Sequence, residues 1–266
     1  MQAAVLGIGL LAPGLEGWNA GRVVLAGKQA YELRAVPEPE AAFLPPNERR
    51  RSSDCVRWAV QVAQEAIGQS GLDPRDVATV FASSGGEMGV LDRLCRTLAM
   101  PERVVSPTLF HQSVHNTAAG YWGIATTCQQ SSTALSCYDD SFAAGLLDAI
   151  TFVCVEEQPV LLVAYDLPPP HPLSEARPLT AGVAASLVLA PSSDRAIVEL
   201  RGSLEKCGTY QPTTLDDVRL ESLRVDNPAG RALPLLAAVA KGGQQTVRLG
   251  LLEDQQLVLE IGPCRH

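Results

Sequence analysis

The most constraining feature of this sequence is a continuous apolar run near its middle. Residues 159–164 are Pro-Val-Leu-Leu-Val-Ala, without the alternation of apolar and polar residues that marks a strand with one solvated face. A strand of this kind is buried on both faces, which requires a parallel or mixed central sheet covered by other layers. The length of 266 residues allows a large core without disulfides or metals. We therefore expect a layered α/β protein.

Other segments supply the remaining elements of such a fold. Strands are predicted at residues 3–11, 77–82, 132–138, 183–189 and 196–200, with a closing hairpin at 246–251 and 257–261. Helices are predicted at residues 18–26, 143–150 and 231–241, and short helical pieces at 106–126.

The best-defined helix is the one that ends at Gly71. Ser52, Ser53 or Asp54 can cap its start, and Gly71 followed by Pro74 stops it. The prolines of residues 31–51 predict an extended connection before it. The basic trio at 49–51 is interpreted as a solvated helix start.

Composition excludes several classes of function. Lys and Arg number 21 against 29 Asp and Glu, a net charge of −8, which argues against binding to nucleic acid. The seven cysteines include no Cys-x-x-Cys pair, so neither a disulfide framework, a metal site nor another cofactor is expected. No run is apolar enough to span a membrane, and residues 1–15 lack the basic start of a secretory signal. A cytoplasmic location is the expectation.

A glycine-rich turn follows the strand predicted at residues 77–82. Residues 83–89 are Ser-Ser-Gly-Gly-Glu-Met-Gly, and such a turn brings the backbone close to a ligand or a neighbouring strand. The spacing of the dinucleotide and phosphate loops is absent, so a nucleotide site is not expected.

The order of these elements and motifs resembles the N-terminal half of the β-ketoacyl synthases, which have the thiolase fold. The resemblance rests on residues 4–13, Gly-Leu-Asp-Pro at 71–74, the turn at 83–89, Ser-Pro at 106–107 and Asn-Thr-Ala-Ala-Gly at 116–120. It covers residues 3–166 and resumes from Arg-Pro at 177–178 to Leu189. It implies one thiolase-like α-β-α domain over residues 1–266, with a ketosynthase-like half at 1–166 and a reduced C-terminal half at 177–266.

The catalytic residues of that family have no counterpart in the matching positions. The family's nucleophilic cysteine heads a small-residue helix, whose N-terminus stabilises the thiolate. Counting forward from Gly120 places Asp139 there, where its carboxylate can cap the helix but cannot form an acyl thioester. The family's catalytic histidines lie in its C-terminal half, whereas the histidines after Asp139 are His171, in a proline loop, and His266. The resemblance implies a subunit without catalysis of its own.

This combination is similar to a chain length factor, the silent subunit that pairs with an active ketosynthase in type II polyketide synthases. Residues 44–50 and 106–120 are most similar to the chain length factors of bacterial aryl polyene clusters. The implied partners are an active ketosynthase and, through the complex, an acyl carrier protein. In the family dimer the strand before the nucleophile position pairs with its counterpart. The implied interface comprises Asn116, Ala118, Ala119, Tyr121, Trp122, Thr133, Leu135, Cys137 and Tyr138.

The resemblance also implies a mechanism for setting product length. Interface side chains close the far end of the partner's acyl tunnel, and a longer chain clashes with packed atoms at a cost of ~1 to 3 kcal/mol. Phe110, His111 and Tyr121 are the bulky candidates for this role.

Three alternatives remain open at this stage. A two-residue register slip makes Cys137 a nucleophile and the chain an active condensing enzyme, since Cys137 and Asp139 face the same way on a strand. His111 and His115 share a helix face at zinc-site spacing, although Gln112 replaces the glutamate that zinc proteases use as base. Finally, the chain only stabilises its ketosynthase. The starter unit and the product length cannot be derived from the sequence.

Overall fold

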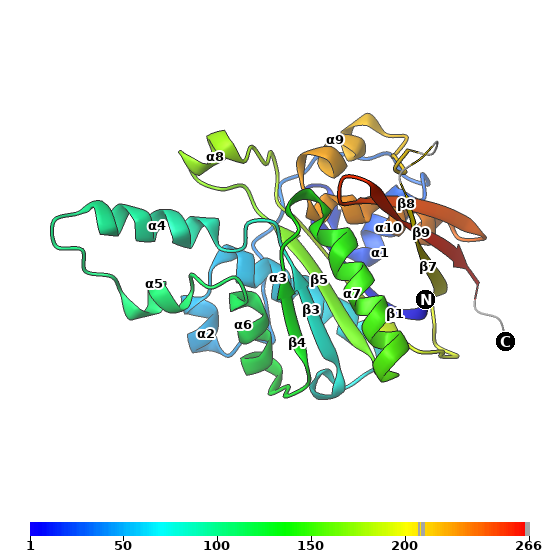
Figure 1. Ribbon diagram of the computed structural model, residues 1–266, viewed down its shortest axis with the longest axis horizontal. Helices are drawn as coiled ribbons and strands as arrows, with labels where there is room; N and C mark the ends of the chain where they lie inside the picture. Colours follow the sequence, from blue (N-terminus) through cyan, green and yellow to red (C-terminus); the bar gives the residue numbers. More distant parts are fainter. Residues whose placement is uncertain (207, 209–210, 264–266) are drawn as a thin grey trace.

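A mixed β-sheet runs through the molecule. The computed structural model describes residues 1–206, 208 and 211–263. Their nine-stranded sheet has the order β4-β3-β5-β6-β1-β7-β9-β8, with β2 paired to β1 (Figure 1). The strands are β1 (Gln2–Ala12), β2 (Leu15–Glu16), β3 (Ala78–Ala82), β4 (Ser132–Leu135), β5 (Val160–Asp166), β6 (Val183–Ala190), β7 (Val198–Lys206), β8 (Gln245–Leu251) and β9 (Gln255–Gly262).

The sheet has a parallel part and an antiparallel part. Strand β3 is parallel to both of its neighbours, β4 and β5, whereas the other pairs among the described residues are antiparallel. Every residue of β5 is buried, which confirms the expected two-faced burial. The carboxyl ends of β3, β4 and β5 consequently lie at one edge of the sheet.

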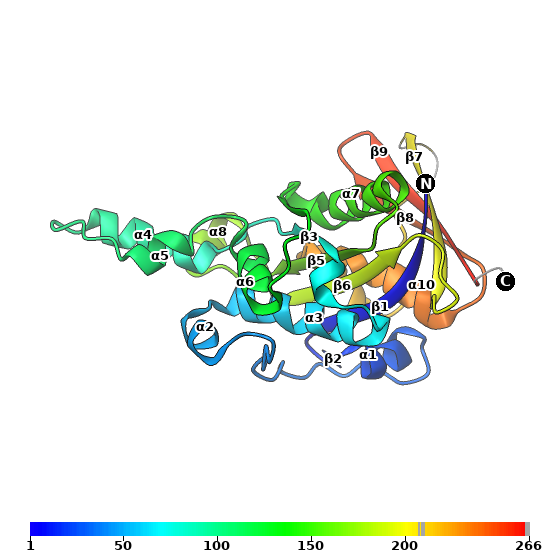
Figure 2. The same cartoon turned by 90° about the horizontal axis from the view of Figure 1, so that it is seen from below.

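Helices cover both faces of the sheet (Figure 2). The α-helices are α1 (Trp18–Leu25), α2 (Pro46–Arg51), α3 (Asp54–Ser70), α4 (Met88–Ala99), α5 (Pro107–His111), α6 (Thr117–Thr126), α7 (Ser141–Glu156), α8 (Leu173–Ala176), α9 (Val218–Asp226) and α10 (Leu233–Lys241). The 3-10 helices are η1 (Pro74–Asp76), η2 (Tyr138–Asp140) and η3 (Ala229–Ala232). Among the described residues, no helix combines the length and apolarity needed to cross a membrane.

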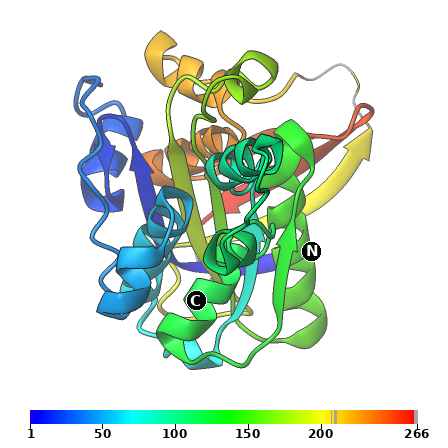
Figure 3. The ribbon, with the colours of Figure 1, turned by 90° about the vertical axis from the view of Figure 1, so that its left-hand side faces the viewer.

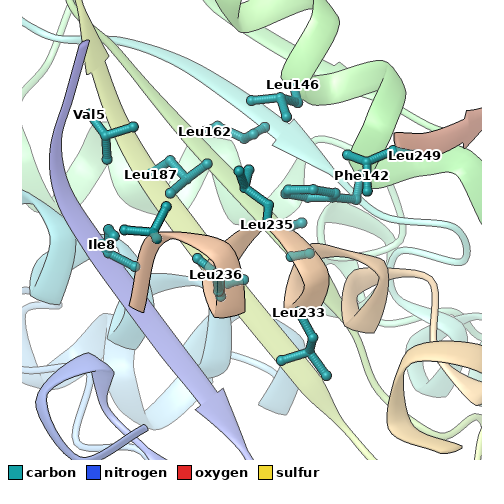
Figure 4. Packing of buried hydrophobic residues seen from close by; sticks show 14 of the residues in the cluster. Val5, Ile8, Phe142, Leu146, Leu162, Leu187, Leu233, Leu235, Leu236 and Leu249 are labelled. Carbon is teal, nitrogen blue, oxygen red and sulfur yellow. The ribbon is translucent and has the colours of Figure 1, made fainter. Parts of the chain in front are cut away.

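Two hydrophobic clusters fill the space between the sheet and the helices on its two faces. Helices α3 and α6 pack on one face, and α7 and α10 pack on the other. Figure 4 shows this second cluster, in which side chains of α7 and α10 meet those of the sheet; its labelled residues are Val5, Ile8, Phe142, Leu146, Leu162, Leu187, Leu233, Leu235, Leu236 and Leu249. The layered α/β fold expected from the sequence is confirmed.

Glycines in β1 allow α3 to lie directly on the strand. A Cβ atom at Gly7 would lie 2.0 Å from the carbonyl oxygen of Ala66, and one at Gly9 would lie 2.1 Å from that of Val62. A bulge between Val5 and Gly7 adjusts the register, so that both glycines face the helix. The backbone of α3 therefore packs at a distance that no other residue permits.

The ends of α3 agree with the sequence prediction, but the basic trio does not. The Ser53 hydroxyl accepts a hydrogen bond from the Val56 N–H, and Gly71 takes the left-handed conformation that ends the helix. Arg49 to Arg51 form the last turn of α2 rather than the start of a helix. Cations at that end complement the partial negative charge of the helix terminus.

Helices α4 and α5 form an arm that projects from the body of the molecule (Figures 1 and 2). We call residues 88–111 the arm. In α4 only Val90 and Leu94 are buried, and α5 has no buried residue. The arm exposes a series of large apolar side chains, namely Leu91, Leu98, Met100, Val104 and Phe110. In Figure 3 the arm points toward the viewer.

Candidate functional site

The carboxyl ends of the three parallel strands bring three segments together. The turn from Ser83 to Glu87 follows β3, the segment from Ser136 to Asp140 follows β4, and Asp166 is the last residue of β5. In open α/β sheets this edge is where loops and helix starts form binding and catalytic sites. We therefore take these segments as the candidate site.

The segment after β4 leaves the sheet earlier than the sequence predicts. The strand expected to reach Tyr138 ends at Leu135. The Ser141 hydroxyl accepts a hydrogen bond from the Cys137 N–H (3.0 Å) and donates one to the Tyr138 carbonyl (2.7 Å). Tyr138 has a positive φ of 50°, so the chain turns away from the sheet here. Cys137 and Asp139 thus share no strand face, and that part of the register-slip hypothesis is wrong.

Asp139 is engaged by two arginines. Its carboxylate forms ion pairs with Arg177 and, at 3.3 Å, with Arg231. The adjacent Asp140 pairs with Arg231 at 3.2 Å and accepts a hydrogen bond from the Leu252 N–H at 2.9 Å. These partners come from the C-terminal half of the chain, so tertiary folding assembles the cluster.

The expectation that Asp139 caps the small-residue helix is wrong. Helix α7 begins at Ser141, its N-cap residue is Asp140, and no side chain caps it. Asp139 lies within the 3-10 turn η2 that precedes α7, and its carboxylate pairs with the two arginines instead.

Arg177 is fixed on both sides. Its guanidinium lies over the Tyr138 ring, 3.8 Å from the centroid, and the arginine side chain is only 13% exposed. Stacking on an aromatic face and pairing with a carboxylate are both interactions that favour arginine over lysine. We call Tyr138, Asp139, Asp140, Arg177 and Arg231 the arginine–aspartate cluster. Its two carboxylates and two guanidinium groups balance in charge.

The histidines that the structure describes take no part in the arginine–aspartate cluster. In the described part of the chain neither Cys137 nor Asp139 has a hydrogen bond with a histidine. His171 is exposed and lies 3.2 Å from Glu175, and His266 falls outside the described residues.

The zinc hypothesis fails on geometry. Helix α5 ends at His111, so His115 lies beyond it and the two share no helix face. The His115 Nε2 atom instead lies 3.0 Å from the Ser83 carbonyl oxygen. Within the described ranges, no group of three metal-binding side chains occurs.

Two buried acids that the sequence interpretation overlooked hold the turn after β3: Glu87 within the turn, and Asp166 at the end of β5. Asp166 accepts hydrogen bonds from Ser83, Ser84 and Gly85 at 2.9 to 3.2 Å, and burial raises its pKa to about 6. Glu87 accepts a hydrogen bond of 2.6 Å from the Ser53 hydroxyl, and burial raises its pKa to about 7. Asp166 could have been recognised from the sequence, because it is an acidic residue at the end of an otherwise apolar strand.

The predicted interface residues divide into two groups. Ala118, Tyr121 and Trp122 are buried in the core beneath α3, and the Tyr121 hydroxyl accepts a hydrogen bond from Gln112 at 3.2 Å. Their side chains offer a partner no surface because helix α6 turns them inward. Exposed or half-buried are Asn116, Ala119, Thr133, Leu135, Cys137 and Tyr138. Strand β4 is an edge strand of the sheet.

The three residues expected to close the acyl tunnel lie in two different parts of the molecule. Phe110 (66% exposed) and the exposed His111 lie on helix α5 of the arm, whereas Tyr121 is 4% exposed in the core. Among the three, only the two arm residues can reach another molecule without rearrangement of the core.

A cationic cavity lies between the start of α3 and the arm. Its volume is about 450 Å³, and Glu87 forms part of its wall. Asp54 lines it as well and pairs with Arg57. The cavity keeps an excess of positive charge because four arginines line it, namely Arg50, Arg51, Arg57 and Arg93. An anionic partner is the ligand that such a lining would attract.

The family model for the N-terminal domain of β-ketoacyl synthases matches residues 26–245, which is most of the sequence. The chain belongs to this family. Its thiolase-like fold is the one described above. No curated protein sequence matches the chain.

Solved structures share the β-ketoacyl synthase fold over nearly the whole chain. A structure of the ketosynthase ApeO with its chain length factor ApeC from Xenorhabdus doucetiae superimposes with a TM-score of 0.73 at 20% identity, covering 98% of this chain and 99% of that one. The ishigamide ketosynthase/chain length factor gives 0.74 at 11% identity, covering 100% of both chains. AntDE:AntF, a type II polyketide synthase acyl carrier protein with its ketosynthase, gives 0.73 at 13% identity, covering 98% and 99%. These likenesses show a shared fold.

Proposed function

We propose that this chain is a chain length factor: a subunit with no condensing activity of its own that pairs with an active ketosynthase and shapes its acyl tunnel. The observation that carries the proposal is the pairing of Asp139 with Arg177 and Arg231, because the sequence resemblance implies that Asp139 takes the position of the family's nucleophilic cysteine.

The chemistry of condensation requires groups that this position does not supply. A ketosynthase forms a thioester on a thiolate, and an adjacent base or a lowered pKa activates that nucleophile. The Asp139 carboxylate cannot form this thioester, and its charge is neutralised by two guanidinium groups. Cys137 lies before the 3-10 turn rather than at the start of α7, so the positive helix end does not activate it.

Two surfaces support pairing with another subunit. Strand β4 presents an edge whose backbone groups can extend the sheet into a partner. The arm adds exposed apolar side chains, of a kind that interfaces bury. The similar structures whose titles name a ketosynthase with a chain length factor favour an active ketosynthase as that partner.

Product length would be set by helix α5 of the arm. Phe110 is large, apolar and exposed, so it can enter a tunnel in the partner and end it. Each further extension of the acyl chain would then clash with its ring at a cost of about 1 to 3 kcal/mol. The arginine-lined cavity would favour an acidic acyl carrier protein near the same side of the molecule.

Co-expression with the cognate ketosynthase tests the pairing. We expect a one-to-one complex by size-exclusion chromatography. The carbonyl groups of Ser131 and Leu135 accept hydrogen bonds from β3, so by alternation the Ala134 N–H points outward. Ala134→Pro removes that N–H and should abolish the complex, whereas the matched control Ala134→Ser should preserve it. A complex that survives Ala134→Pro would exclude pairing through β4.

Activity assays on the complex separate the remaining hypotheses. Polyene formation should persist in Cys137→Ala, because the thiol belongs to the partner; loss of activity there would identify this chain as a condensing enzyme. Phe110→Ala should give longer products. Unchanged products in an intact complex would show that the chain only stabilises the ketosynthase.

A further inference from the structure

The arm is joined to the body through two roots that touch each other. One root is the turn from Ser83 to Glu87, which leads from β3 into α4. The other is the segment from Gln112 to Asn116, which leads from α5 into α6. The His115 Nε2 atom of the second root lies 3.0 Å from the Ser83 carbonyl oxygen of the first. A group that fixes the first root therefore also constrains the second.

Asp166 holds the first root. Its Oδ1 atom accepts hydrogen bonds from the hydroxyl of Ser83 (2.9 Å), from the N–H and hydroxyl of Ser84 (both 2.9 Å) and from the N–H of Gly85 (3.2 Å). The Asp166 residue itself is fixed, because it is 4% exposed, pairs with β6 and accepts a hydrogen bond of 2.9 Å from the Asn227 side chain. One rigid carboxylate thus binds three successive residues of the turn.

Glu87 ties the start of α4 to the start of α3. Its Oε1 atom accepts a hydrogen bond of 2.6 Å from the Ser53 hydroxyl, and the same hydroxyl caps α3. Glu87 is also the N-cap residue of α4, and it is 6% exposed. The carboxylate therefore anchors the residue that precedes the arm to α3, the longest helix of the body.

We propose that Asp166 and Glu87 are positioning residues that latch the arm onto the body, and that the latch determines where Phe110 sits in the partner's acyl tunnel. The second part rests on the proposed function, whereas the latch itself does not. The contacts that carry the proposal join two buried acids to the turn that leads into the arm.

The latch should respond to pH in a defined direction. Burial raises the pKa of Asp166 to about 6 and that of Glu87 to about 7, so both acids bind protons more readily in the latched state than when released into water. As the pH rises from about 4 to about 7, the ratio of latched to released arm should fall, by up to about 100-fold for each acid. The ionisable groups around the two acids are Asp54, Cys55, Arg93, His115 and Tyr165.

The effect of these neighbouring groups can be separated from that of Asp166 and Glu87. Burial raises the pKa of the Cys55 thiol and the Tyr165 hydroxyl well above the ordinary values, so both stay neutral over this range. Asp166→Asn and Glu87→Gln remove the two acids and leave His115 in place. A pH response that survives both substitutions would overturn the assignment to Asp166 and Glu87.

Hydrogen–deuterium exchange of the full chain measures the latch directly. At pH 7 we expect the arm amides, residues 88–111, to exchange at least about tenfold faster in Asp166→Ala, because several buried hydrogen bonds are lost. Amides of α3 should be unchanged. The matched control is Asp148→Asn, which neutralises a half-buried acid of α7 whose pKa burial also raises. Unchanged arm exchange in a folded Asp166→Ala variant would refute the latch.

Two further measurements keep the test decisive. If Asp166→Ala does not fold, Ser84→Ala removes one hydroxyl donor and should speed arm exchange a few-fold; no effect would count against the proposal. In the ketosynthase complex, Ser84→Ala, which removes one of the donors to Asp166, should broaden the distribution of product lengths. A loosened arm with unchanged products would support the latch and contradict the proposed role of Phe110.

Discussion

Removing the Asp139 carboxylate should destabilise the protein without affecting any chemistry. In Asp139→Ala, Arg177 keeps its place over the Tyr138 ring but loses its carboxylate partner, and Arg231 keeps only Asp140. Exposed ion pairs contribute at most about 1 kcal/mol, whereas breaking a buried pair costs about 3 to 5 kcal/mol. With Arg177 13% exposed and Asp139 39% exposed, the free energy of unfolding should fall by about 2 kcal/mol.

Urea unfolding of four chains isolates the interaction. The wild type, Asp139→Ala, Arg177→Met and the double variant form a double-mutant cycle, and methionine preserves most of the packing on Tyr138. The coupling between the two side chains should be about 1 to 2 kcal/mol, with an unchanged dependence on urea concentration. Glu32→Ala is the control, since its ion pair with Arg34 is largely exposed and should contribute below about 0.5 kcal/mol. A coupling as small as that of the control would refute the structural role of the cluster.

Three further predictions concern other parts of the molecule. Burial raises the pKa of Glu87 to about 7 and that of Asp166 to about 6, so the folded state binds more protons than the unfolded state. The free energy of unfolding should therefore fall by about 3 kcal/mol per acid between pH 4 and pH 8. In urea titrations, Glu87→Gln should remove one of these two contributions. Gly9→Ala should cost at least about 3 kcal/mol, because its Cβ would meet the α3 backbone, whereas Gly68→Ala, with open space around it, should raise the melting temperature slightly. Asp139→Cys should react with iodoacetamide, since two guanidinium groups favour a thiolate, yet yield no condensation by the chain alone; condensation would show that the site still carries the remaining machinery.

Local patterns were sufficient for the main elements of the fold. The unbroken apolar run of β5 predicted a two-faced strand, and the capping residues at 52–54 with Gly71 predicted both ends of α3. The closing hairpin of β8 and β9 followed from two apolar runs around a polar turn. These features depend on neighbouring residues, which is why a single sequence reveals them.

Contacts between distant segments could not be predicted from such local patterns. The sequence placed Asp139 at the head of a helix but could not show that Arg177 and Arg231 would pair with it. Likewise, Tyr121 and Trp122 looked like interface anchors, yet packing against α3 buries them. The early end of β4 follows from hydrogen bonds of Ser141, a residue that the sequence pattern assigned to the next helix.

The sequence by itself therefore determined the layered α/β architecture, the family resemblance and the absence of a cysteine at position 139. Only the tertiary structure decided which side chains remain available to a partner, how Asp139 is neutralised and which acids hold the arm. The reason is physical: periodicity and capping are set over a few residues, whereas burial and charge pairing depend on groups that approach each other only after the chain has folded.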